Sequence, residues 1–216
     1  MRKVLDKHCL RLVLLAFVVV LHLYGFKPLR AQNFERMSDI ESETYGEKAY
    51  VSGDYSTMKN VRRFWVNETQ KLKSNRQLEF ALTGSNEAVL KVTIPARLLF
   101  SQGDTVLVSS AENQLRPLLP LLKGPEAVAT VIVASFSDNN GSDNYLNKFS
   151  TSRASAIHRW LAKQGVGPTY IHSYGFGNKV PRNQNANIRE RERNRRISLY
   201  LVPNKSLLRD AKKGKI

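Results

Sequence analysis

The stretch from residue 137 to residue 153, SDNNGSDNYLNKFSTSR, constrains the fold of this chain more than any other. It follows an apolar run at 131–134, continues as a polar loop containing a glycine, and passes into an amphipathic helix. Asp138 lies where the run ends and Arg153 lies inside the helix, so the two side chains can converge. Such a pair suits a zwitterion, because a carboxylate binds an ammonium and a guanidinium binds a carboxylate in a bidentate fork. The alternative is an ion pair that only braces the loop against the helix.

The same stretch resembles the OmpA-like peptidoglycan-binding domain, a family shared by outer-membrane protein A, the peptidoglycan-associated lipoprotein and the flagellar stator protein MotB. The family pattern is T-D-x-x-G-x-x-x-x-N-x-x-L-S-x-x-R-A. The positions that match it directly are Asp138, Gly141, Ser150, Arg153 and Ala154. Ser137 replaces the threonine and Phe149 replaces the leucine, and both changes are mild.

One position departs from this pattern. Leu146 stands where the family has asparagine, and Asn147 follows it. A leucine side chain cannot donate a hydrogen bond, so the resemblance implies weaker ligand binding here unless Asn147 takes over the role. Farther along, residues 171–177 (IHSYGFG) and 191–197 (RERNRRI) resemble later motifs of the family, and the resemblance covers roughly residues 88–203.

The resemblance implies an α/β (α+β) sandwich with β-α-β-α-β-α-β order, a mixed sheet and helices on one face, preceded by a β-hairpin. It also implies a non-enzymatic domain that binds peptidoglycan and needs no cofactor or metal. Stem peptides of peptidoglycan often carry diaminopimelate, whose side chain ends in an ammonium and a carboxylate. Asp138 would take the ammonium and Arg153 the carboxylate. The candidate ligand-binding residues are Asp138, Arg153, Ser137, Gly141, Asn147, Asn194 and Arg195.

Hydrophobic periodicity predicts the individual elements. Alternating apolar residues at 78–82 and 90–94 flank a turn and predict the hairpin. A short or kinked helix is expected over 109–122, because Pro117 and Pro120 interrupt it. Strands are predicted at 127–134, 171–174 and 197–201, a long helix ending at Gly165, and a charged helical turn at 187–193. Residues 62–66 fit either an edge strand or a helix, and we expect Trp65 to pack against the main domain.

Composition divides the chain into five parts. Residues 1–31 have a basic start, an apolar run at 12–26 and a small residue, Ala31, which predicts a cleaved signal peptide. An uncleaved anchor is the alternative, although the run is shorter than the about 20 residues that a membrane-spanning helix needs. Residues 32–75 are predicted to be a polar, partly ordered spacer with some strand, 76–87 a strand and turn leading in, 88–203 the main domain, and 204–216 a basic, frayed tail.

The formal net charge of +16 predicts binding to a polyanion. Residues 1–31 hold six Lys/Arg and one Asp, so the remaining chain keeps a charge of +11. We expect an exported protein in the periplasm, associated with the outer membrane or the wall. Its expected partners are then peptidoglycan, outer-membrane proteins or anionic lipid head groups, and not nucleic acid. Cys9 precedes the apolar run, so lipidation by the usual route is not expected.

Three other functions remain open. An adaptor with a degenerate cleft would bind an acidic protein or an anionic membrane, and Leu146 favours it. A stator-like inner-membrane protein would keep its first segment, but the apolar run has no acidic residue to carry protons. An exported hydrolase would need a carboxylate pair in a groove, and none is evident. His158 and His172 lack the nearby cysteine or acidic cluster that a zinc site requires.

Overall fold

The protein is described here by a computed structural model, which covers residues 55–73, 77–83, 87–125 and 127–216. These residues belong to one compact unit. The predicted signal peptide, residues 32–54 of the predicted spacer and residues 84–86 of the hairpin turn lie outside the described residues. Within the described segments, no helix combines the length and the apolar character that crossing a membrane requires.

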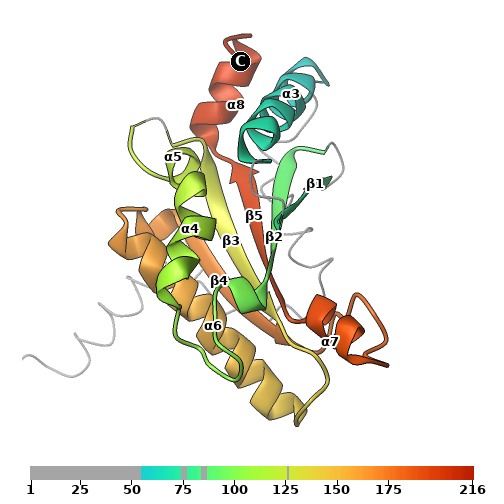
Figure 1. The fold of residues 1–216 in the computed structure, drawn as a ribbon. Helices are drawn as coiled ribbons and strands as arrows, with labels where there is room; N and C mark the ends of the chain where they lie inside the picture. The colour runs from blue at the N-terminus through green and yellow to red at the C-terminus, as the bar shows by residue number, and fades with distance from the viewer. Residues whose placement is uncertain (1–54, 74–76, 84–86, 126) are drawn as a thin grey trace, which may run out of the picture. The chain divides into compact units, whose positions relative to one another are not determined.

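A five-stranded mixed sheet forms the centre of this unit (Figure 1). Its strands are β1 (Glu79–Thr83), β2 (Val89–Pro95), β3 (Ala129–Phe136), β4 (Ile171–Gly177) and β5 (Arg196–Pro203). They lie in the order β1-β2-β5-β3-β4, and only the β3–β4 pair is parallel. The predicted fold class is therefore confirmed. The predicted hairpin is confirmed as well, because β1 and β2 pair antiparallel from Glu79↔Thr93 to Thr83↔Val89.

Helix α6 (Asp143–Lys163) crosses from the end of β3 to the start of β4 and packs on both strands. Ser142 caps its start, because the side chain accepts a hydrogen bond from the backbone N–H of Tyr145. The helix approaches β4 closely at Gly175. A Cβ on Gly175 would lie 2.2 Å from the backbone nitrogen of Thr151, so only glycine fits at that contact.

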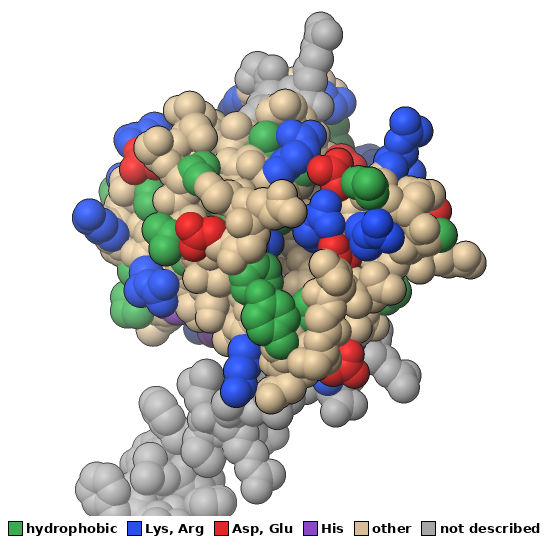
Figure 2. Space-filling model, turned by 60° about the horizontal axis from the view of Figure 1, so that its bottom comes forward, with side chains coloured by type: hydrophobic (Ala, Val, Ile, Leu, Met, Phe, Trp, Pro, Cys, Tyr) green, Lys and Arg blue, Asp and Glu red, His purple; other side chains and the backbone are tan. Residues whose placement is uncertain are grey.

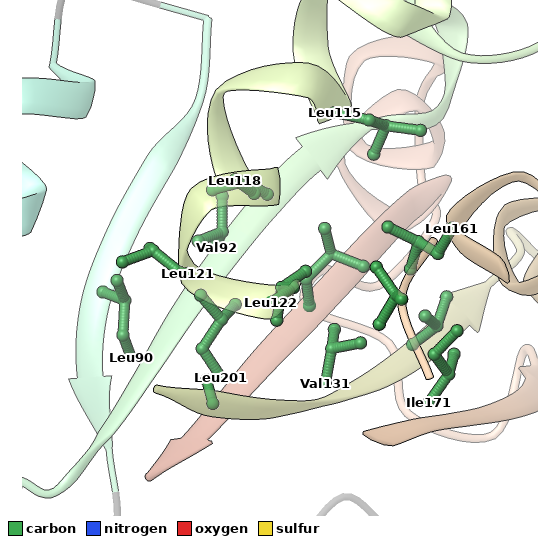
Figure 3. Packing of buried hydrophobic residues seen from close by; sticks show 14 of the residues in the cluster. Leu90, Val92, Leu115, Leu118, Leu121, Leu122, Val131, Leu161, Ile171 and Leu201 are labelled. Carbon is green, nitrogen blue, oxygen red and sulfur yellow. The ribbon is translucent and has the colours of Figure 1, made fainter. Parts of the chain in front are cut away.

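The segment between β2 and β3 is a broken helix, as the two prolines predict. Two 3₁₀ turns (Ser109–Ala111 and Arg116–Leu118) alternate with the short helices α4 (Glu112–Leu115) and α5 (Leu119–Leu122). Pro117 and Pro120 each stand in the first turn of a segment, where a missing N–H costs least. The leucines of this segment form the middle of the core (Figure 3). They belong to the same core cluster as Leu90 and Val92 of β2, Val131 of β3, Leu201 of β5 and Leu161 of α6.

Two helices outside the predicted domain complete this core. Helix α3 (Tyr55–Leu72) buries Met58, Val61 and Trp65, and the indole N–H of Trp65 donates to the carbonyl of Ala88 at 2.7 Å. The expectation that Trp65 packs against the main domain is confirmed. The expectation of a spacer with some strand was wrong for residues 55–72, because apolar residues at helical spacing meet a complementary core.

The predicted frayed tail is also an ordered helix. Helix α8 (Lys205–Lys212) begins at Asn204, whose side chain accepts from the N–H groups of Ser206 and Leu207. Leu207 and Ala211 are each 1% exposed and join the core. The prediction was wrong because it rested on the basic residues alone. The Asn204 cap and the apolar residues at helical spacing stabilise the helix.

Candidate functional site

Asp138 lies two residues beyond the end of β3, just past the register shift between Ser135 and Phe136 in the β3–β4 pair. One carboxylate oxygen, Oδ1, accepts from the N–H of Asn140 at 3.1 Å. The other, Oδ2, forms an ion pair with Nη1 of Arg195. The Asp138 side chain is 10% exposed and the Arg195 side chain 37% exposed, so the acidic partner is buried and the basic one remains accessible. Arg195 also lies 3.8 Å from a carboxylate oxygen of Glu192.

Arg153 does not form an ion pair with Asp138, although it lies near enough to feel its charge. Its Nε donates to the carbonyl of Asp104 at 2.8 Å and its Nη2 to the carbonyl of Ser101 at 3.3 Å. The guanidinium also lies over the rings of Phe149 and Phe100, at 4.3 and 4.8 Å from their centroids. The predicted convergence of Asp138 and Arg153 is thus a shared neighbourhood rather than a direct contact.

Burial lowers the pKa of Arg153 to about 10, and the charge of Arg195 contributes in the same direction. The charges of Asp104 and Asp138 act in the opposite direction. The site therefore holds two guanidiniums close together, that of Arg153, which is buried, and that of Arg195, which is partly exposed. The carboxylate of Asp138 is the negative charge beside them. We call Asp138, Arg153 and Arg195 the Asp138 cluster.

The loop that holds Arg153 is built by Asp104. Its Oδ1 accepts from the N–H groups of Thr105 and Val106, at 2.6 and 3.0 Å, and these two hydrogen bonds lower the pKa of the Asp104 carboxyl. The turn points the Asp104 carbonyl toward helix α6. Sequence reasoning missed this loop, although an Asp directly after Gly103 is a common turn signal.

Ser137 and Gly141 shape the loop around Asp138. Ser137 is 5% exposed, and its N–H donates to the carbonyl of Gly177 at 2.7 Å, which ties the end of β3 to the end of β4. Its hydroxyl has no hydrogen-bond partner among the described residues. Gly141 has a φ of +144°, and a Cβ there would lie 3.0 Å from the ring of Tyr145. The backbone conformation therefore favours glycine, and any other residue would also have to displace the Tyr145 ring slightly.

Leu146 and Asn147 are neighbours on α6, but the first is buried and the second is exposed. Leu146 is 2% exposed and packs under the loop beside Gly141, so it serves as a core residue of the site. Asn147 is exposed on α6, and its backbone carbonyl accepts from the hydroxyls of Ser150 and Thr151. The hydroxyl of Ser150 also accepts from the N–H of Gly177 at 2.8 Å, which fastens α6 to the end of β4.

Asn194 is fully buried and braces the loop before helix α7 (Ile188–Asn194). Its Oδ1 accepts from the N–H groups of Arg182 and Asn183, at 2.8 and 3.0 Å. Its Nδ2 donates to the Asn183 carbonyl and to Oδ1 of Asn185, at 2.9 and 2.7 Å. The side-chain amide is committed to the protein, so this geometry gives Asn194 a supporting role beside Arg195 rather than a contact with a ligand.

Figure 2 views the molecule with the lower end of Figure 1, where α7 lies, turned forward. Basic side chains gather there beside acidic ones and next to an apolar strip. Tyr145, which is 53% exposed, stacks on Phe149 with ring centroids 5.7 Å apart. The Asp138 cluster thus has both signs of charge and exposed aromatic surface near it, an arrangement that suits a zwitterionic ligand with apolar parts.

His158 contacts the hydroxyl of Ser173 at 3.3 Å, and burial lowers its pKa. No group of three or more His, Cys, Asp or Glu side chains that could hold a metal ion occurs among the residues that the structure describes.

The OmpA family model matches residues 99–195. This segment is a domain of the OmpA family. All seven candidate residues lie inside the OmpA family domain, whereas helices α3 and α8 lie outside it.

Two curated relatives each match about a third of the chain. Outer membrane protein A of Bordetella avium is 32% identical over 73 residues, which are 34% of this chain and 38% of that protein. Outer membrane porin F of Pseudomonas fluorescens is 39% identical over 67 residues, which are 31% of this chain and 21% of that protein. The match therefore spans well under half of the length of either relative.

Two solved structures share the fold. A MotB-like protein from Desulfovibrio vulgaris has a TM-score of 0.59 at 19% identity, covering 68% of this chain and 96% of its own. The cell wall anchor of the T6SS from Pseudomonas aeruginosa has a TM-score of 0.53 at 20% identity, covering 67% of this chain and 97% of its own. Both likenesses cover more of this chain than the family match does, and they show a shared fold.

Proposed function

We propose that this OmpA family domain binds peptidoglycan non-covalently and so ties a component of the cell envelope to the wall. The family membership of residues 99–195 supports this role, and a structure with the same fold is named as a cell wall anchor. The observation that carries the proposal is the Asp138 cluster, which gathers one carboxylate and two guanidiniums at the end of β3.

The ligand in this proposal is the diaminopimelate of the stem peptide. Its ammonium binds the carboxylate of Asp138 and competes there with Arg195. Its carboxylate binds Arg195 and the outward edge of Arg153, whose remaining N–H groups are not used by Ser101 and Asp104. Such a carboxylate also relieves the repulsion between the two guanidiniums, which contributes to the low pKa of Arg153. Each charged group of the zwitterion thereby binds an opposite charge of the protein, and no covalent step is needed.

Residues around the cluster support this binding in the proposal. Gly141 lets the loop pass close to the ligand, and the N–H of Ser137 fastens the start of the loop to the carbonyl of Gly177. Asn194 holds Arg195 in place through the loop at 182–185. The site of action is the periplasm, with export directed by residues 1–31.

One observation favours a second candidate, an adaptor that binds an acidic protein. Asp138 is already paired with Arg195, so the acid is occupied in the ligand-free protein. If that pair does not open, Asp138 cannot bind a ligand ammonium, and the domain would instead bind an acidic protein through its basic surface.

Co-sedimentation with purified sacculi at low and moderate salt separates these two functions. Specific binding should survive moderate salt, whereas attraction to a basic surface should be screened. Asp138→Asn and Arg153→Lys should each weaken binding about tenfold to a hundredfold, since a charge-assisted hydrogen bond contributes about 1.5–3 kcal/mol. Asp143→Asn and Arg159→Lys change the same residue types on exposed positions of α6 and serve as controls. Unchanged sacculus binding by folded Asp138→Asn and Arg153→Lys proteins would favour the adaptor.

A further inference from the structure

Helices α3 and α8, which lie outside the family match, form a joint surface side by side (Figure 1). Nδ2 of Asn60 donates to the carbonyl of Ala211 at 2.9 Å, and Nη2 of Arg63 donates to the carbonyl of Ile216 at 2.8 Å. Figure 1 shows the two helices running in opposite directions, α3 toward the sheet and α8 away from it. The end of α8 therefore lies beside the first half of α3, and Ile216, which follows α8, lies next to Arg63.

This surface is strongly basic. Residues 55–73 contain five Lys/Arg and one Glu, and residues 204–216 contain five Lys/Arg and one Asp. Together they hold a formal charge of +8, half of the chain's +16. The acidic residues nearby are already used, because ion pairs form between Lys71 and Glu68, Arg62 and Glu87, and Arg209 and Asp210.

Lys59 near the start of α3, and Lys212, Lys213 and Lys215 at and beyond the end of α8, are exposed and take part in no ion pair within the described residues. We call them the basic end. The helix dipole explains a basic residue in the last turn of α8, such as Lys212. It does not explain Lys59, which lies in the first turns of α3, or Lys215, which lies beyond α8.

The basic end lies away from the Asp138 cluster. Arg195 directly precedes β5 and Lys205 follows it, so the eight residues of this strand separate the two regions. At about 3.3 Å per residue, the strand spans about 25 Å. A ligand of the Asp138 cluster and a partner of the basic end can therefore bind at the same time.

We propose that the basic end binds the surface of an anionic phospholipid membrane. Lysine ammoniums are point charges on flexible stems, which suit mobile lipid phosphates that offer no fixed geometry. A partner with planar carboxylates in fixed positions would favour arginine forks instead. Tyr55, which begins α3 and is 82% exposed, adds an amphipathic ring of the kind enriched at membrane interfaces. The domain then contacts the membrane at one end and the wall at the other.

Vesicle co-sedimentation of the purified protein tests this proposal. The protein should bind vesicles of phosphatidylcholine with phosphatidylglycerol, should not bind phosphatidylcholine alone, and should dissociate as salt is raised. A lysine near an anionic membrane contributes about fivefold to affinity, so changing Lys59, Lys212, Lys213 and Lys215 together to Gln should weaken binding more than a hundredfold.

A matched control replaces four exposed basic residues elsewhere, Arg97, Lys123, Arg159 and Lys163, by Gln. This protein has the same net charge as the test variant and should keep most of the vesicle binding. Sacculus binding should be unchanged in the test variant, whereas Asp138→Asn should lose sacculi and keep vesicles. The proposal is overturned if the two quadruple variants lose vesicle binding equally, if the wild type ignores anionic vesicles, or if it binds polyglutamate or duplex DNA in preference to them.

Discussion

Arg195, and not Arg153, is the residue that forms the ion pair with Asp138. The two arginines consequently have different roles in one site. Arg153 is 4% exposed and is held by the carbonyls of Ser101 and Asp104, whereas the Arg195 side chain is 37% exposed and is held mainly by charge. A ligand can therefore displace Arg195 from Asp138 while Arg153 stays in place.

The Asp138–Arg195 pair should contribute little to folding. Asp138 is buried, but the Arg195 side chain is 37% exposed, so solvent screens the attraction, and we expect a contribution near the upper end of the about 0.2–1 kcal/mol of exposed ion pairs. In a double-mutant cycle with Asp138→Asn and Arg195→Gln, urea unfolding should give a coupling energy below about 1 kcal/mol. A coupling of several kcal/mol would mean that the pair is a structural brace, which would weaken the case for exchange with a ligand.

Leu146→Asn should destabilise the domain. The resemblance alone predicts tighter ligand binding for this change, but Leu146 is 2% exposed beneath the Gly141 loop. Loss of apolar packing and burial of an amide should lower the free energy of unfolding by about 2–4 kcal/mol. Leu146→Met is the control and should cost less than about 1.5 kcal/mol. Urea unfolding near the wild-type midpoint for Leu146→Asn would show that the side chain finds hydrogen-bond partners there.

Gly175→Ala should separate α6 from β4. The new Cβ would lie 2.2 Å from the backbone nitrogen of Thr151, a contact that no rotamer can relieve. We expect a loss of about 3 kcal/mol in thermal or urea unfolding, at the upper end of what overpacking costs. Gly103→Ala is the control, because a Cβ there meets nothing within 4 Å. This change should lower the free energy of unfolding by only about 1 kcal/mol, the cost of placing alanine in a left-handed conformation. Equal losses at both glycines would contradict the close approach of α6 to β4.

Leu207→Ala tests whether the end of the chain is part of the folded core. Leu207 is 1% exposed and packs into the same cluster as α3 and β5. A buried leucine truncated to alanine costs about 2–5 kcal/mol, whereas Lys213→Ala, on the exposed side beyond α8, should change stability by less than about 0.5 kcal/mol. If Leu207→Ala unfolds at the wild-type urea concentration, the tail is not packed as described.

Periodicity predicted the sheet well, because alternation of apolar residues reflects burial of one face. The pattern holds for the hairpin partners Phe80 and Val92 and for the core residues Ile197 and Leu199. The Asp138 loop was also predictable, since strand, polar loop and helix follow one another in the sequence. The strands and this loop were predictable because their signals come from residues that are close together in the sequence.

The partners of Arg153 were not predictable in this way. The carbonyl of Asp104 lies 49 positions away, and any residue type can supply a carbonyl. Arg195 reached Asp138 from 57 positions away, and its charge alone does not distinguish it from its neighbours Arg193 and Arg196. Arg196 is in fact 4% exposed and lies over Phe136. Long-range backbone contacts and the burial of single arginines depend on the assembled fold.

The most direct test of the proposed binding is calorimetric titration with two soluble stem peptides that differ in one group. One peptide contains diaminopimelate, and the other has lysine at that position, which keeps the ammonium and lacks the adjacent carboxylate. We predict that the diaminopimelate peptide binds about tenfold to a hundredfold more tightly, and that the difference largely disappears in the Arg153→Lys, Arg195→Gln double variant. Equal affinity for the two peptides, or binding of neither, would contradict recognition of the zwitterion by the Asp138 cluster.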